Sequence, residues 1–168
     1  PWTVTMQAGT HVCLRQVRAD AVYKAIAEEG VNHLCGAPIV LNMIANAPAE
    51  EKREFSHTVQ VMTAGAPPAP TTIENMENAG FNITHTYGLT ETYGPSVVSA
   101  WQSDWDSMPV SDRSAMKARQ GVRYTMLEGL QVFDPETMTE VSPDGEALGE
   151  GMMRGNVGMK GYLKNPAA

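Results

Sequence analysis

The sequence predicts an α/β fold: a layered, mostly parallel sheet with flanking helices, followed by the start of a smaller β-rich subdomain. Short apolar runs alternate with segments of helical period up to the strand-like run at residues 81–84, whereas short strands and turns follow from Tyr124 onward. Alternating strands and helices joined by short connections favour a parallel, doubly wound sheet. The expected boundary lies near Gln120, which divides the chain into residues 1–119 and 120–168.

Local signals mark where each element should begin and end. Asp20 and Ser111 are the expected N-caps of two helices. Gly30 is the expected left-handed stop of the first of these helices, and Pro38 the start of the next. The segments expected to be strands are 2–14 (as strand, turn, strand), 31–35, 58–63, 81–84, 129–133 and 150–154, and those expected to be helices are 20–29, 39–45, 71–79 and 111–119.

Composition excludes several classes of partner. The 168 residues carry 12 basic and 19 acidic side chains, a net charge of −7, and the basic residues form no cluster. Nucleic acid and anionic membrane are therefore not expected partners. No apolar run reaches the length of a membrane span, and no signal peptide opens the chain, so the cytoplasm is the default compartment.

The cysteines and histidines do not predict a metal cage. Cys13 and Cys35 lie in apolar surroundings without CxxC spacing, and the 4 histidines are scattered along the chain. We therefore expect both cysteines to be small buried hydrophobic residues.

The segment at 84–95, THTYGLTETYGP, combines glycines, threonine hydroxyls, tyrosine rings and a carboxylate directly after a strand-like run. Polar glycine-containing loops at the carboxyl ends of strands are where α/β sheets bind ligands. Thr90 offers a hydroxyl suited to phosphate oxygens, and Glu91 is a hard oxygen ligand of the kind Mg²⁺ prefers. The segment thus suits a nucleotide phosphate with its metal. The alternative is an ordinary solvated β-turn.

The motif YGLTET resembles the signature of the adenylate-forming (AMP-binding) superfamily. Further blocks follow the same order: TAGAPPAP is similar to the family's adenine loop, and GEGMMRGNVGMKGYLKNP to its late G-E-x-x-x-R-G block. Between them, WQSDWDSMPVSDRSAMKARQGV resembles a segment of the medium-chain acyl-CoA synthetase and methylthioalkanoate-CoA ligase branch. The resemblance implies the middle of the large N-terminal domain of such an enzyme, which joins a carboxylic acid to coenzyme A through an acyl-adenylate made from ATP.

The resemblance also implies a role for each motif residue. Thr90 would bond the α-phosphate and Glu91 would hold Mg²⁺, and these two are the expected catalytic residues. A glycine at position 88, where some members carry tryptophan, implies room for a longer acyl chain. The residues expected around ATP or AMP are Gly65, Ala66, Pro67, His85, Thr86, Tyr87, Gly88, Leu89 and Thr90.

The family's phosphate loop, ribose-binding aspartate and catalytic lysine have no counterpart in this sequence. We therefore expect a fragment that is inactive alone and that can self-associate through surfaces left uncovered. The alternative is a truncated, non-catalytic nucleotide-binding or protein-interaction module.

Overall fold

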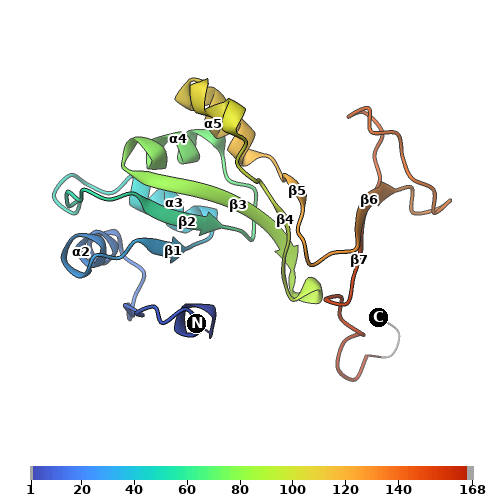
Figure 1. The fold of residues 1–168 in the computed structure, drawn as a ribbon, viewed down its shortest axis with the longest axis horizontal. Helices are drawn as coiled ribbons and strands as arrows, with labels where there is room; N and C mark the ends of the chain where they lie inside the picture. The colour runs from blue at the N-terminus through green and yellow to red at the C-terminus, as the bar shows by residue number, and fades with distance from the viewer. Residues whose placement is uncertain (1, 166–168) are drawn as a thin grey trace.

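The computed structural model describes residues 2–165 and confirms the α/β class: a mixed five-stranded sheet with flanking helices is followed by a separate two-stranded sheet (Figure 1). Pro1, the first residue of the expected first unit, and Pro166, the last residue of the final block, lie outside the described residues.

The larger sheet has the strand order β1-β2-β3-β4-β5. Its strands are β1 (His33–Cys35), β2 (Val59–Thr63), β3 (Phe81–Leu89), β4 (Gly94–Val98) and β5 (Val122–Arg123). Helical crossovers make β1, β2 and β3 parallel, whereas β4 and β5 are added antiparallel. The sheet is therefore parallel at one end and antiparallel at the other.

Helices cover one face of the parallel strands. The helices α2 (Ala19–Glu29), α3 (Pro38–Ala45) and α4 (Pro70–Asn78) share one core with the inward-facing residues of β2 and β3. Val59, Val61 and Ile83 are almost completely buried there, whereas Met62, on the opposite face of β2, is 42% exposed. The doubly wound expectation was wrong because β1, β2 and β3 follow one another without the reversal of order that would place helices on both faces.

The helix boundaries follow the glycine and proline signals. Gly30 ends α2 in the left-handed region with φ 67°, and Pro38 occupies the first turn of α3. The two capping predictions were wrong. Asp20 lies inside the first turn of α2 and pairs with Arg18 at 2.6 Å, and α5 (Val110–Ala118) begins one residue before Ser111.

The opening segment is not a strand, turn, strand unit. Residues Trp2–Met6 form the short helix α1, and the chain from there to the start of α2 is mostly exposed. Among residues 2–165 no strand lies beside it to accept a ladder, so local helical hydrogen bonds satisfy part of its backbone. Cys13 is exposed in this segment, and Cys35 is exposed on the uncovered side of β1, so the expectation that both are buried was wrong.

The chain after the expected boundary at Gln120 contributes to both sheets. Strand β5 pairs with β4 in the larger sheet, while β6 (Gly129–Phe133) and β7 (Glu150–Arg154) pair only with each other. Figure 1 shows β6 and β7 standing away from the helices and parallel strands. Within residues 2–165, none of the helices is both long and apolar enough to cross a membrane.

Candidate functional site

The central motif forms a hairpin rather than the expected loop. β3 continues through Tyr87 to Leu89, a 3-10 turn covers Thr90–Thr92, and β4 returns antiparallel from Gly94. Thr92 stabilises the tip: its hydroxyl accepts a hydrogen bond from the Leu89 amide at 3.0 Å and donates one to the Gly94 carbonyl oxygen at 3.1 Å. Glu91 lies in the turn that joins these two strands, and Figure 1 shows the end of β3 and the start of β4 extending away from the helices.

Gly88 is required for close approach of the two hairpin strands. A Cβ atom at this position would lie 2.1 Å from the Gly94 carbonyl oxygen, which is far inside van der Waals contact. The ladder shifts register between Tyr87 and Gly88 because of a bulge there. The space that a side chain at position 88 would enter is thus filled by backbone. The expectation that this glycine leaves room for a longer acyl chain stays a prediction.

The turn at 65–67 leaves β2 beside the end of β3. Thr63 pairs with His85 in the parallel register, so Gly65–Pro67 emerges next to Thr86–Gly88 at the carboxyl edge. Gly65 has φ 92°, a conformation that favours glycine, and all three residues of the turn are exposed. The structure therefore brings together the two segments that the sequence analysis assigned to adenine.

Two of the expected site residues are buried. His85 donates a hydrogen bond from Nδ1 to the Arg119 carbonyl oxygen at 3.0 Å, which ties β3 to the end of α5. Thr86 donates from Oγ1 to the Thr63 carbonyl oxygen at 3.4 Å, which ties β3 to β2. Each side chain is 2% exposed, so both hold the strand ends in place from within.

The other expected residues lie at the surface. Tyr87 is 36% exposed beside the 65–67 turn, while Leu89 and Thr90 are exposed farther along the hairpin. Glu91 is half-buried because a segment from the end of the chain contacts it. The Tyr162 hydroxyl donates a hydrogen bond to Glu91 Oε1, and the Met159 amide donates to the Glu91 carbonyl oxygen at 2.8 Å.

The electrostatics of the tip favour an ionised Glu91. The hydrogen bond from Tyr162 lowers the pKa of the Glu91 carboxyl, and the same bond raises the pKa of the Tyr162 hydroxyl. Glu91 is therefore a carboxylate at neutral pH, with an oxygen other than Oε1 left to accept a further ligand.

The donor set at the tip suits a metal ion that arrives with a nucleotide. Among the described residues, no three His, Cys, Asp or Glu side chains form a cage. Mg²⁺ is commonly bound by one or two carboxylates together with substrate phosphates. Glu91 and the neighbouring Thr90 hydroxyl fit that arrangement.

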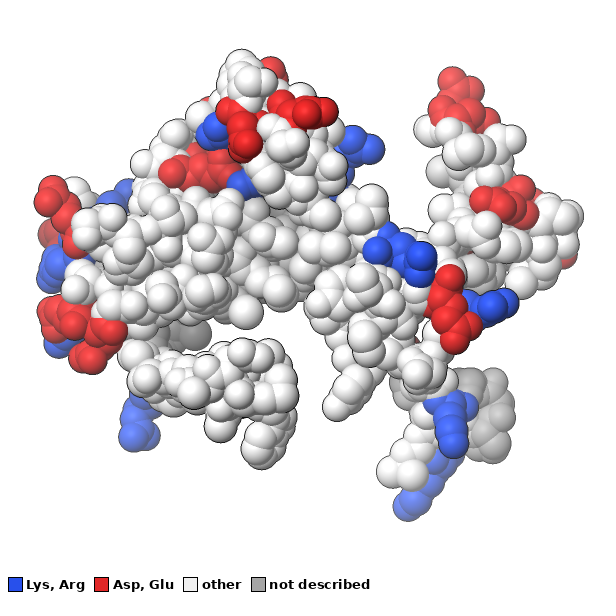
Figure 2. Space-filling model, viewed as in Figure 1, with Lys and Arg blue, Asp and Glu red and all other residues white. Residues whose placement is uncertain are grey.

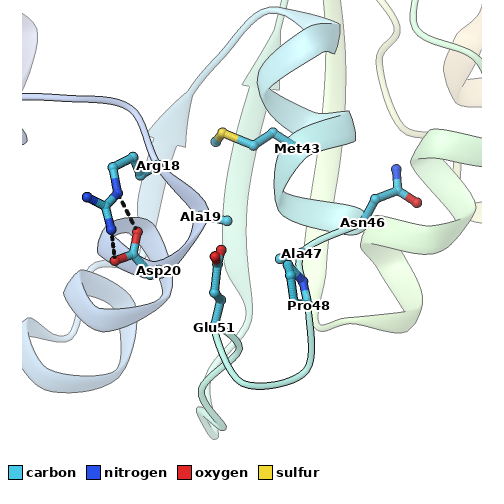
Figure 3. Close-up of a pocket in the computed structure, with 8 residues that line it drawn as sticks. All are labelled: Arg18, Ala19, Asp20, Met43, Asn46, Ala47, Pro48 and Glu51. Atoms are coloured by element: carbon cyan, nitrogen blue, oxygen red, sulfur yellow. Dashed lines mark hydrogen bonds and ion pairs between the residues drawn. The ribbon is translucent and has the colours of Figure 1, made fainter.

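A hollow of about 400 Å³ lies elsewhere, between the start of α2 and the end of α3. Figure 3 shows that Arg18 and Asp20 bond each other at its rim, with Met43 and Glu51 lining other sides. None of its lining residues belongs to the motifs, and its charged groups partly satisfy one another. We therefore place the candidate site at the strand ends rather than in this hollow.

Charges of both signs are interspersed on the face drawn in Figure 2, with acidic groups at the edge nearest α2 and above α5. This face has no continuous basic area of the kind that would contact a nucleic-acid backbone.

The fold and this edge define a class: an α/β protein with a polar, glycine-containing site beyond the carboxyl ends of parallel strands. The family model described as "AMP-binding enzyme" matches residues 1–163, and the chain belongs to that family. It is 55% identical to an acetate–CoA ligase from Humulus lupulus, in an alignment that covers 99% of this chain and 30% of the relative. It is 53% identical to a peroxisomal acetate/butyrate–CoA ligase from Arabidopsis thaliana, covering 100% of this chain and 30% of that protein.

Solved structures show the same fold. A luciferase-like enzyme from the mealworm Zophobas morio superposes with a TM-score of 0.77 at 19% identity, over 96% of this chain and 37% of that one. An o-succinylbenzoate–CoA synthetase from Bacillus subtilis, solved with ATP and magnesium, gives 0.70 at 17% identity, over 97% and 31%. The chain thus spans about a third of the length of the proteins it matches.

The sequence analysis missed the residues that hold Glu91 from the far end of the chain. Tyr162 lies in the late glycine-rich block, which was identified as a block, but its tyrosine was given no role. The block's similarity to a family motif was the available signal. What could not be read from the sequence is that residues 71 positions apart meet at the hairpin tip.

Proposed function

We propose that this chain is the nucleotide-binding part of an AMP-forming acid–CoA ligase. In the reaction of the longer protein, a carboxylate oxygen attacks the α-phosphorus of MgATP, so that an acyl-adenylate forms and pyrophosphate leaves. The thiol sulfur of coenzyme A, after losing its proton, then attacks the acyl carbon and AMP leaves. The observation that carries this proposal is the adjacency of the 65–67 turn and Tyr87 at neighbouring strand ends in a chain of the AMP-binding family.

The adenine would lie between the 65–67 turn and the ring of Tyr87. An exposed aromatic face beside a turn without bulky side chains suits a flat heterocycle, with Gly88 and Leu89 continuing the same edge. His85 and Thr86 would act by fixing the backbone of this wall, because their polar atoms bond carbonyl groups inside the protein.

The phosphates would extend from there toward the hairpin tip. Thr90 would donate its hydroxyl to the α-phosphate, and Glu91 would bind the Mg²⁺ that arrives with ATP. The metal would neutralise charge that develops on the phosphate oxygens during an in-line transfer.

The acid is proposed to be short. The two relatives described above are named as an acetate–CoA ligase and an acetate/butyrate–CoA ligase. We expect the longer protein to release AMP faster with acetate or butyrate than with octanoate, each in the presence of MgATP and coenzyme A. Faster turnover of octanoate would reject a short-chain assignment but not the ligase reaction.

The ligase proposal is tested by Glu91→Gln in the longest open reading frame that carries this sequence. Loss of an outer-shell partner of a metal costs about 10- to 100-fold in affinity or activity, and loss of the ligand itself should cost at least as much. We therefore expect acid-dependent ATP–pyrophosphate exchange to fall by about 100-fold or more. Glu29→Gln, at the exposed end of α2, is the matched control and should keep full activity. Equal activity of the two variants would refute the role of Glu91.

The alternative of a non-catalytic module is tested on the 168-residue chain itself. Precise positioning accounts for roughly 7–11 kcal/mol of a barrier in favourable cases, and a chain with about 30% of the relatives' length presents few positioning groups. We expect no AMP release when this chain is incubated with MgATP, coenzyme A and butyrate or octanoate. Turnover comparable to that of the longer protein would show that these 168 residues suffice.

The domain division, compartment and assembly state are separate proposals. We propose that the subdomain boundary lies near Gln120, so that residues 1–119 and 120–168 form two units, although β5 of the second unit pairs with β4 of the first. We propose a cytoplasmic location. The competing location is the peroxisome, which the Arabidopsis relative's name includes, and a fluorescent fusion of the longer protein would distinguish the two.

We also propose that the isolated chain self-associates, because Trp2, Met6 and Leu163 are largely exposed, and light scattering would detect this.

A further inference from the structure

The tip of the β3–β4 hairpin is held by a segment from the far end of the chain. The Tyr162 hydroxyl donates to Glu91 Oε1, and the Met159 amide donates to the Glu91 carbonyl oxygen at 2.8 Å. One contact fixes the side chain and the other fixes the backbone of the same residue. Glu91 is therefore restrained at both ends.

The segment that supplies Tyr162 is shaped to present it. Gly161 has φ 146° and Lys164 has φ 59°, and the Asn165 amide bonds the Tyr162 carbonyl oxygen at 3.2 Å, which closes a tight turn. The Tyr162 side chain is 50% exposed, so its ring is not packed into a core. Its hydroxyl contact with Glu91 is thus not a by-product of burying the ring.

A carboxylate that binds a metal through one oxygen commonly accepts a hydrogen bond on the other. Such a bond fixes the plane of the carboxyl group and the direction of its free lone pairs. At Glu91 the tyrosine hydroxyl takes Oε1, which leaves Oε2 as the oxygen for a cation.

On this geometry we propose that Tyr162 is a positioning residue for the metal carboxylate Glu91. Its hydroxyl orients the carboxyl group so that the remaining oxygen meets the divalent cation carried by ATP. This inference rests on the proposed function, since it takes Glu91 as the magnesium ligand. It adds a residue from the late glycine-rich block to the nucleotide site.

The test compares Tyr162→Phe, Glu91→Gln and Tyr124→Phe in the longest open reading frame that carries this sequence. Tyr162→Phe removes only the hydroxyl. Tyr124, at 39% exposed and outside the hairpin tip, is the matched control for loss of a phenol. The readouts are the affinity for Mn²⁺ in the presence of ATP, followed by electron paramagnetic resonance, the affinity for ATP in excess EDTA, and the midpoint of thermal unfolding.

We expect Tyr162→Phe to weaken Mn²⁺ binding about 10- to 100-fold, which is the typical cost of losing an outer-shell partner. Metal-free ATP affinity and thermal midpoint should stay at the wild-type values, and Tyr124→Phe should match wild type throughout. A structural role for Tyr162 would instead lower the thermal midpoint or weaken metal-free ATP binding in parallel, and that result would overturn the inference.

Glu91→Gln separates failure of this inference from failure of the proposed function. If Glu91→Gln weakens Mn²⁺ binding and Tyr162→Phe leaves it within twofold of wild type, the positioning role is wrong while the metal carboxylate stands. If Glu91→Gln also leaves Mn²⁺ binding unchanged, the metal assignment on which both rest is wrong.

Discussion

The two sheets of this protein differ in whether helices pack against their strands. The parallel strands β2 and β3 place Val59, Val61 and Ile83 against helices, and these side chains are at most 2% exposed. The β6–β7 pair is fully hydrogen-bonded along its register, yet each of its residues is half-buried or exposed. Backbone pairing thus forms a strand in both places, but only the first region has a core. An isolated two-stranded sheet is marginally stable in water.

The β3–β4 hairpin lies between the part of the molecule that has a core and the part that has none. Strand β3 begins in the core at Phe81 and Ile83, whereas the tip of the hairpin contacts Met159 and Tyr162 near the end of the chain. The segment proposed to contact adenine therefore lies next to the core, whereas Glu91, the proposed metal ligand, is held by a segment with few buried residues.

The largest expected contrast is between a core substitution and its counterpart in the small sheet. Phe81 is 2% exposed and packs against Tyr23 and Phe55, so Phe81→Ala should cost about 3–5 kcal/mol of unfolding free energy. Val132 in β6 is 43% exposed, so Val132→Ala should stay within about 0.5 kcal/mol. Urea denaturation of both variants measures the change in unfolding free energy. Similar costs would mean that the two sheets are equally well packed.

A buried ion pair should give the next largest effect. The Lys117 ammonium on α5 donates to Glu77 on α4 and to Asn82 Oδ1 at 2.7 Å, and its side chain is 6% exposed. Lys117→Met would leave these acceptors without their donor, at a cost of about 3 kcal/mol.

That value lies at the low end of the range because Arg113 also approaches Glu77, at 3.7 Å. Lys24→Met is the matched control, since it removes an exposed pair with Glu28 and should cost about 0.5 kcal/mol or less. If urea unfolds both variants at the same midpoint concentration, the buried pair does not hold α5 in place.

The glycines of the two regions should respond in opposite directions to alanine. Gly88→Ala forces a Cβ against the Gly94 carbonyl oxygen, so the hairpin must open, at about 1–3 kcal/mol. A methyl group on Gly151 in β7 would enter open space, with no other atom within 4 Å, so Gly151→Ala should be neutral or stabilise by up to about 1 kcal/mol. Thermal unfolding compares the two, and stabilisation by Gly88→Ala would show that the hairpin strands are not in close contact.

The smallest expected effect is on how the stability of two loops in the β-rich region depends on pH. Asp134 accepts hydrogen bonds from the Thr137 and Glu136 amides, and Asp144 from the Ala147 and Glu146 amides. These bonds lower the pKa of both carboxyl groups.

A lowered pKa in the folded state means that the stabilisation is fully present above about pH 4, the ordinary aspartate value, and is lost as the pH falls through the lowered pKa. Carboxyl ¹³C chemical shifts should therefore titrate below the ordinary value for both residues. Titration at that value would show that the loops are open in solution.

Much of the α/β half is determined locally. Gly30 adopts the left-handed conformation that stops α2, Pro38 opens α3, and the alternation of Val59, Val61 and Thr63 places one side of β2 inward. These signals act over a few residues, through backbone sterics and side-chain period, so a sequence carries them without knowledge of the fold. The chemical groups of the site and their order along the chain are likewise written in the sequence.

Tertiary structure alone decided how those groups are used. No strand was predicted for residues 94–98, and they form β4 because they pair with the open edge of β3. Cys35 is exposed because its side of the sheet carries no helix, which depends on strand order rather than on the residue. Tyr162 meets Glu91 across 71 positions of sequence. Contacts of this kind depend on how separate elements pack, and no local pattern encodes that.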